Sequence, residues 1–170
     1  MDTTRAAPGT TARRPRLQDG VLQASMAAFL AVGHDCAIMV NGDSPTLPAE
    51  FVERAIAALR EPGDRVVLGP ARDGGYYLVG LKHPHPRLFE DIAWSTPEVL
   101  ACTLRRADEI GLSVVMLPMW YDVDEPEDFL QLQTELSRQA PGIGAAVTNG
   151  PAHHTRAFLA AWTQAQAAAP

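Results

Sequence analysis

The stretch CAIMVNGDSPTLPAEFVERAIAALR (residues 36–60) joins a short apolar run to an amphipathic helix through a polar loop. The run CAIMV carries only apolar side chains, which is typical of a strand that is covered on both faces. After the loop, apolar residues recur at helical spacing from Leu47 to Leu59, and Thr46 is expected to cap this helix. A strand, a loop and a helix in this order predict one unit of an α/β sheet.

The same alternation continues on both sides of that unit. Because strands and helices alternate along the chain, we predict an α/β fold with a mostly parallel sheet and helices on both of its faces. The helices are expected from residue 17 to Gly33, from residue 96 to 110 and after residue 128, and the further strands at residues 65–68, 76–81 and 112–117.

The length of 170 residues suits one domain. Residues 1–16 lack apolar periodicity and are expected to form a disordered tail. Residues 17–140 should form the folded domain. Residues 141–170 should form an extension that is partly helical, over residues 156–166.

The bulk composition excludes several classes of protein. A formal net charge of −6 argues against nucleic acid as a partner, because phosphate binding needs an excess of basic residues. The chain contains neither a run of ~20 apolar residues that could span a membrane nor an apolar signal core, so we expect a cytoplasmic protein. The two cysteines, Cys36 and Cys102, lie in apolar runs and are expected to be reduced core thiols.

Two acidic loops follow expected strands and precede expected helices. Asp43 lies in NGDSP after the first strand, and Asp124 lies in YDVDEPED after the last. Ligands of open α/β sheets bind outside the carboxyl ends of the strands, and Mg²⁺ or Mn²⁺ takes one or two carboxylates there. Turn formation and helix capping are the alternative roles of these acids. If both face the same edge, they would hold one divalent ion.

Two further loops have a structural and a functional interpretation. In Asp73-Gly74-Gly75-Tyr76, the glycines predict a tight turn, but they also allow a ligand to approach the backbone, and Asp73 could accept hydrogen bonds from hydroxyl groups. In Trp94-Ser95-Thr96, a hydroxyl is expected to cap the next helix, while Trp94 packs in the core or forms the floor of a sugar site.

Taken in order, NGDSPTLP, LGPARDGGYYLVGL, WSTPEVL and YDVDEPEDF resemble a bacterial family of short GT-A-like glycosyltransferases, a former domain of unknown function. The resemblance covers about residues 17–137. It implies the nucleotide-diphospho-sugar transferase fold, a variant of the Rossmann-like arrangement. More distantly, the pattern is similar to phospholactate and molybdenum-cofactor guanylyltransferases, which share that fold.

The resemblance also implies roles for individual residues. Asp43 matches the family's metal-binding aspartate, and Asp124 matches the position that closes the metal site around Mg²⁺ or Mn²⁺. Asp73 would act in catalysis. The sugar or acceptor side would be lined by Gly74, Gly75, Tyr76, Trp94, Ser95 and Thr96.

The sequence departs from the family at its start. Members open with a strand, a Gly-containing loop and a Lys-Thr-Arg-Leu stretch that hold the nucleotide, whereas the one lysine here is Lys82. An N-terminally shortened, incomplete fold would leave a sheet edge uncovered, and we therefore expect a homo-oligomer.

Three functions remain open at this point. The first is metal-dependent transfer from a nucleotide sugar to an acceptor that the sequence does not identify. The second is nucleotidyl transfer of the guanylyltransferase type. The third is a catalytically silent binding or assembly module.

Overall fold

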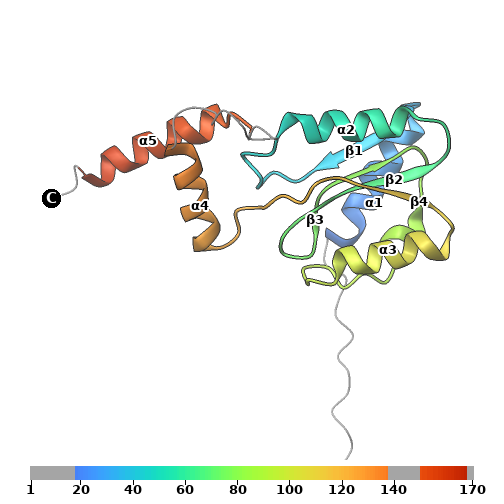
Figure 1. Ribbon diagram of the computed structural model, residues 1–170. Coiled ribbons are helices and arrows are strands. Elements are labelled where there is room, and N and C mark those ends of the chain that lie inside the picture. Colours follow the sequence, from blue (N-terminus) through green and yellow to red (C-terminus); the bar gives the residue numbers. More distant parts are fainter. Residues whose placement is uncertain (1–17, 138–149, 168–170) are drawn as a thin grey trace, which may run out of the picture.

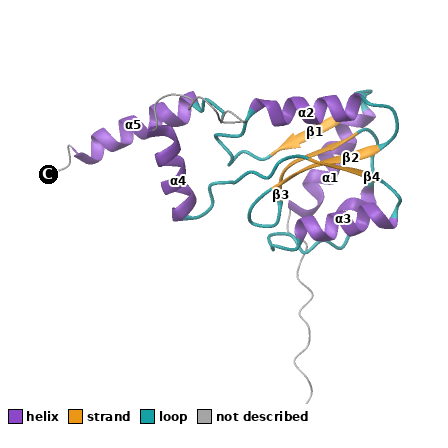
Figure 2. Ribbon diagram, viewed as in Figure 1, coloured by secondary structure: helices purple, strands orange, loops and turns teal. Residues whose placement is uncertain are grey.

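The computed structural model describes residues 18–137 and 150–167, which form an α/β fold (Figures 1 and 2). Each helix and strand expected from the sequence is present in the described ranges, and the 3₁₀-helix η1 is the one element that the sequence did not indicate. The elements are α1 (Gln18–Ala31), β1 (Ala37–Val40), α2 (Ala49–Arg60), β2 (Arg65–Pro70), β3 (Tyr76–Leu81), η1 (Pro86–Phe89), α3 (Val99–Glu109), β4 (Ser113–Met116), α4 (Pro126–Ser137) and α5 (His153–Ala167).

The sheet is mixed, which corrects the prediction of a mostly parallel sheet. Its order is β1-β3-β2-β4, in which β3 runs antiparallel to both neighbours and β2 runs parallel to β4. The cause is the short β2–β3 connection, because a few residues can join antiparallel neighbours but a parallel pair needs a long crossover. The strands β1, β2 and β4 nevertheless share one direction, so their carboxyl ends meet at the same edge.

Helices cover both faces of this sheet, as the sequence predicts. On one face, Phe51, Ala55 and Leu59 of α2 pack against Val67 and Leu78. On the other, α1 and α3 cover the sheet (Figure 1), and Leu88 and Phe89 of η1 pack into the same layer. The core of that second face contains Met26, Val66, Leu68, Val79, Leu81, Leu88 and Ala107. Two apolar layers therefore fix the strands whose ends carry the acidic loops.

The helix α1 buries less of its apolar surface than its sequence pattern suggests. Met26 is 1% exposed, whereas Val21 and Phe29 remain 53% and 52% exposed. Positions eight residues apart lie about 80° from each other around a helix of 3.6 residues per turn, so the two exposed side chains share one flank of α1. One flank of α1 therefore offers apolar surface to solvent.

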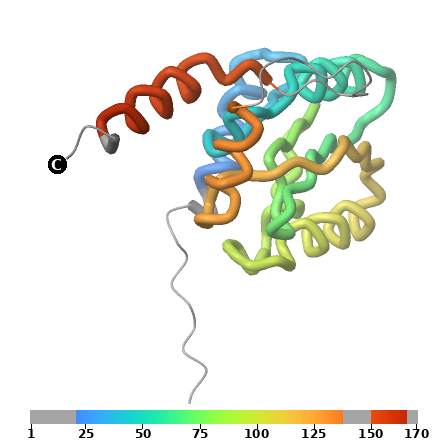
Figure 3. The backbone as a smooth tube through the Cα atoms, turned by 60° about the vertical axis from the view of Figure 1, so that its left-hand side comes forward, coloured from blue at the N-terminus to red at the C-terminus, as the bar shows by residue number. Residues whose placement is uncertain are grey.

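The C-terminal helices α4 and α5 form a small unit beside the sheet. Leu132, Leu136 and Leu159 join the two helices, and the Phe129 and Trp162 rings meet edge to face at 5.8 Å. In two views, α5 extends away from the sheet (Figures 1 and 3). The helix expected at residues 156–166 lies within α5. The predicted tail, residues 1–16, and the predicted boundary at residue 140 lie outside the described residues.

A membrane span requires a helix that is both long and strongly apolar. Among the described residues, no helix meets both requirements.

Candidate metal and ligand site

The β2–β3 hairpin carries Asp73 at its tip. The loop is closed by hydrogen bonds from Gly74 N to the Ala71 carbonyl (3.3 Å) and from Ala71 N to the Gly75 carbonyl (3.0 Å). Gly74 has φ 90°. Three-residue hairpin loops require a left-handed conformation of this kind at one position, which glycine adopts most easily. The Asp73 carboxylate accepts a hydrogen bond from Gly75 N at 2.8 Å. The predicted tight turn is therefore confirmed, and it fixes the direction of the Asp73 side chain.

An extended segment after β4 runs between this hairpin and the loop that follows β1. Trp120 bridges to Ala71 in parallel fashion, and Val123 N donates to the Asp43 carbonyl at 2.9 Å. Side chains two residues apart in an extended chain point to the same side. Asp122 and Asp124 consequently project together toward the edge of the sheet.

Three carboxylates meet at this edge. Asp73, Asp122 and Asp124 each have an oxygen within 4.8 Å of the others. Burial raises the pKa of Asp122, and the charges of Asp73, Asp124 and Asp43 raise it further. Burial also raises the pKa of Asp124, followed by the charges of Asp43 and Asp73. The group, which we call the carboxylate cluster, is therefore held together against mutual repulsion, with Asp43 alongside it.

The structure changes the membership of the site that the sequence suggests. The sequence pairs Asp43 with Asp124 and gives Asp73 a separate role. The structure places Asp73 with Asp124, adds Asp122, and leaves Asp43 outside the 4.8 Å group although its carbonyl bonds to Val123. Asp122 was missed because the resemblance to the family points to Asp124 alone in the run YDVDEPED. The signal was available in the spacing of the two aspartates across one valine.

The donor chemistry of this edge fits a divalent cation. Mg²⁺ and Mn²⁺ prefer oxygen ligands and accept carboxylates together with water or phosphate. The loop after β1 adds the Asn41 side-chain carbonyl and the Ser44 hydroxyl, buried oxygens for which the described part of the chain provides no hydrogen-bond partner. The residues present are therefore compatible with the ion that the sequence pattern implies.

The loop of Trp94, Ser95 and Thr96 lies against the hairpin. Leu100 N donates to the Gly74 carbonyl at 2.9 Å, and a Cβ on Gly74 would lie 2.2 Å from the Pro97 carbonyl oxygen. The Trp94 ring meets the Tyr76 ring edge to face at 6.4 Å, and both pack against the core. The structure therefore supports a packing role for Trp94, and a contact with sugar remains a prediction.

The residues that cap α2 and α3 differ from those that the sequence predicts. Thr96 Oγ accepts a 3.4 Å hydrogen bond from Glu98 N, but the N-cap of α3 is Glu98 itself. Thr46 does not cap α2, whose N-cap is Pro48. The buried Thr46 hydroxyl instead donates to the Tyr121 hydroxyl at 3.1 Å, because the loop turns its side chain toward the segment that carries the cluster.

Tyr121 links this segment to α4. Its hydroxyl donates to Glu135 at 2.9 Å, and burial raises the pKa of Tyr121 to about 12, so the donating proton is retained at neutral pH. The Gln131 amide donates to the other Glu135 oxygen at 2.9 Å, and Arg72 donates to Gln131 at 2.8 Å. A network of hydrogen bonds that links Thr46, Glu135, Gln131 and Arg72 therefore holds the Tyr121 ring, which precedes Asp122.

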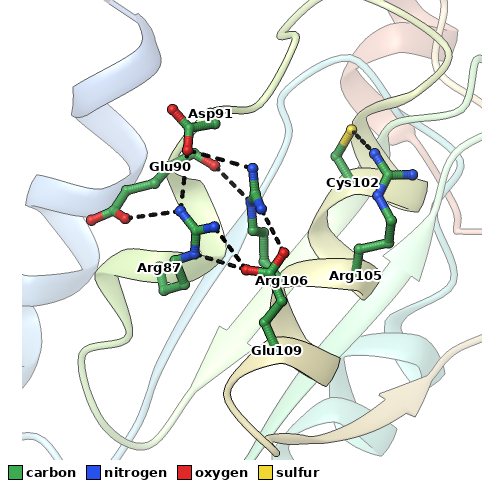
Figure 4. A network of polar contacts seen from close by, with 7 residues as sticks. All are labelled: Arg87, Glu90, Asp91, Cys102, Arg105, Arg106 and Glu109. Atoms are coloured by element: carbon green, nitrogen blue, oxygen red, sulfur yellow. Dashed lines mark hydrogen bonds and ion pairs between the residues drawn. The ribbon is translucent and has the colours of Figure 1, made fainter.

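Cys102 is buried, Cys36 is half-buried, and both are free thiols. Arg105 of α3 approaches the Cys102 sulfur at 2.9 Å, near a network in which Arg87 and Arg106 pair with Glu90, Asp91 and Glu109 (Figure 4). This network ties η1 to α3.

Comparison with known proteins supports the fold and the family. A family model described as an uncharacterized protein conserved in bacteria (DUF2064) matches residues 5–96. Among curated proteins, none matches the sequence significantly. A crystal structure from Desulfovibrio desulfuricans G20, of a protein proposed to be a nucleotide-diphospho-sugar transferase, is similar with a TM-score of 0.68 and 27% identity. The similarity covers 78% of this chain and 58% of that protein, so the chain spans less than two thirds of its neighbour's length.

Proposed function

Because the chain belongs to the bacterial family DUF2064, and its fold is similar to that of a protein proposed to transfer nucleotide-diphospho-sugars, we propose that it is a metal-dependent glycosyltransferase-like protein. Its donor would be a nucleotide-activated sugar. The observation that carries this proposal is the carboxylate cluster at the carboxyl ends of the strands, where ligands of α/β sheets bind.

The cluster suits the chemistry of a departing diphosphate. Asp122 and Asp124, with Asp43 beside them, would hold Mg²⁺ or Mn²⁺. When bound, the ion would neutralise charge that develops on the diphosphate. Asp73 is held by Gly75 N through one oxygen, so its second oxygen could accept a hydrogen bond from a hydroxyl of the sugar or acceptor. These assignments rest on the positions of the carboxylates.

The acceptor side would be formed by the two loops that lie together beside the cluster. Gly75 would let a ligand approach the backbone, whereas Gly74 is packed against the Pro97 backbone. Tyr76 and Trp94, whose rings meet edge to face, would support the ligand. Ser95 and Thr96 would add hydroxyl groups. We further propose that the protein acts in the cytoplasm.

Calorimetric titration of the full chain with uridine and guanosine nucleotides, with and without Mn²⁺, tests this function. We expect Mn²⁺-dependent binding that prefers one nucleoside diphosphate, because the ion would bridge its phosphates to the cluster. A preference for guanosine triphosphate would instead support nucleotidyl transfer. If no nucleotide of the panel binds, the result would contradict both enzymatic functions and favour a binding or assembly module.

We also propose that the protein forms a homodimer through β1. This strand ends the described sheet, and Asn41 N bonds to Tyr77 O of β3, so the backbone groups of Ile38 and Val40 point to the open side. β1 has no charged side chain to discourage pairing, and Phe29 on the neighbouring α1 is half exposed. A second copy could pair with this edge and cover α1.

Light scattering on the purified chain checks this assembly. The expected mass is about 37 kDa, twice the 18.3 kDa of one chain. Phe29→Asp should shift the protein toward the monomer, since it places a charge in the proposed contact, whereas Glu53→Gln on the exposed surface of α2 should leave the mass unchanged. A monomer at all concentrations of the wild type would exclude this proposal.

A further inference from the structure

Arg72 places a positive charge beside the carboxylate cluster. It is the neighbour of Asp73 at the hairpin tip, and its guanidinium carbon lies 5.2 Å from the centre of the Tyr121 ring. Tyr121 directly precedes Asp122. A cation–π contact of this kind orients the planar guanidinium group over the ring. The arginine is therefore held at the point where both cluster-bearing segments begin.

Contacts with α4 fix the same side chain without neutralising it. Arg72 donates one hydrogen bond to Gln131, whose amide is held by Glu135. The guanidinium group has five N–H donors, so this bond leaves others available. Among the described residues, the arginines that form ion pairs with carboxylates are Arg54, Arg87 and Arg106, and Arg72 contributes to none of these pairs.

The ion-pair network in Figure 4 shows the contrast. There, Arg87 and Arg106 are surrounded by Glu90, Asp91 and Glu109, so their charge is satisfied within the protein. Arg72 has a ring and a neutral amide as its partners, although three aspartates lie nearby. An oriented arginine with unused donors is well suited to an anion that comes from outside the chain.

We propose that Arg72 binds the diphosphate of the activated donor beside the carboxylate cluster. This inference rests on the function proposed above. Three carboxylates, one divalent cation and a diphosphate together carry a net negative charge, and a guanidinium group would offset part of it. Its planar donors match two phosphate oxygens, and a charge-assisted pair of this type is stronger than a neutral hydrogen bond.

A purely structural role would use the same contacts in another way. Arg72 could join the hairpin to α4, with no contact to a ligand. In that case Gln131→Ala, which removes the bond to α4 but keeps the guanidinium group and its ring contact, should have the same consequences as Arg72→Gln. Comparing the two variants therefore distinguishes an arginine that binds the ligand from one that only joins the hairpin to α4.

Calorimetry on the full chain tests the inference with two probes, Mn²⁺ alone and inorganic pyrophosphate in the presence of Mn²⁺. We expect Arg72→Gln to keep the dissociation constant for Mn²⁺ within about 2-fold and to weaken pyrophosphate binding about 10- to 100-fold, as expected for the loss of a charged hydrogen-bonding partner. Arg72→Lys, which keeps the charge but not the two parallel N–H donors, should lose less affinity than Arg72→Gln and more than Gln131→Ala. Gln131→Ala should stay within about 3-fold for both probes.

The outcomes distinguish this inference from the function on which it rests. The role of Arg72 would be contradicted if Arg72→Gln bound pyrophosphate as the wild type does, or if Gln131→Ala lost as much affinity as Arg72→Gln. Neither result would contradict the proposed metal site. A wild type that binds no Mn²⁺ would overturn both. If Arg72→Gln melts well below the wild type, its binding data no longer report on the side chain alone, and Arg72→Lys is compared with Gln131→Ala instead. Equal affinity of these two variants for pyrophosphate would reject the proposal.

Discussion

Gly74→Ala should lower the free energy of unfolding by about 3 kcal/mol or more. Gly74 has φ 90°, where an L-residue is strained. The added Cβ would also lie 2.2 Å from the carbonyl oxygen and 2.6 Å from the Cα of Pro97, and backbone atoms cannot move aside as a flexible side chain can. For a chain of this size, the melting temperature should fall by about 6–12 °C, measured by differential scanning calorimetry.

Two other glycines provide matched controls. Gly111 has φ 63°, but a Cβ there would meet nothing within 4 Å, so Gly111→Ala should cost only about 1–2 kcal/mol of backbone strain. A Cβ on Gly42 would also meet open space, and its φ lies outside the left-handed region, so Gly42→Ala should change the melting temperature little. If Gly74→Ala melts no lower than Gly111→Ala, the hairpin does not pack tightly against Pro97.

Local patterns in the sequence predicted the elements well. The strand at residues 76–81 was placed to the residue, and α2 and α3 were found within one to three residues of their ends. These segments have strong periodicity or continuous apolar runs that end at turn-forming residues, and such signals are local. The coverage of both sheet faces followed from the same alternation.

The order of the strands could not be predicted from local patterns. β3 follows β2 in the chain and pairs with it, but it also inserts between β2 and β1, and this second pairing depends on contacts between distant segments. The sequence does predict the hairpin turn at Asp73 and Gly74. A short loop excludes a parallel connection, so the sequence did contain part of the answer.

The candidate site was predicted in part for the same reason. The acidic loops that carry Asp43 and Asp124 lie next to each other, as strand direction requires, and Val123 bonds to the Asp43 carbonyl. Which carboxylates point inward depends on side-chain direction within irregular loops. Asp122 enters the cluster because its segment stays extended, while the helix α4 begins at Pro126.

Asp122→Asn should remove most of the affinity for Mn²⁺ and make the metal-free protein more stable. Loss of one carboxylate ligand should weaken Mn²⁺ binding by at least about 100-fold. The pKa of Asp122 is raised by burial and by neighbouring aspartates, so its ionised form opposes folding. Relief of this repulsion, about 0.5–1 kcal/mol, should raise the melting temperature by about 1–4 °C at pH 7. The gain should vanish as the pH falls below about 4, where the carboxyl group is protonated in both states.

Calorimetric titration of Mn²⁺ into the wild type, Asp122→Asn and Glu127→Gln tests the carboxylate cluster most directly. Glu127 lies in the same acidic run and is exposed at the start of α4, so its variant removes an equal charge without touching the cluster. We predict one Mn²⁺ per chain for the wild type and for Glu127→Gln, and binding at least about 100-fold weaker for Asp122→Asn. Equal binding by all three proteins, or no binding by the wild type, would contradict a metal site at this edge of the sheet.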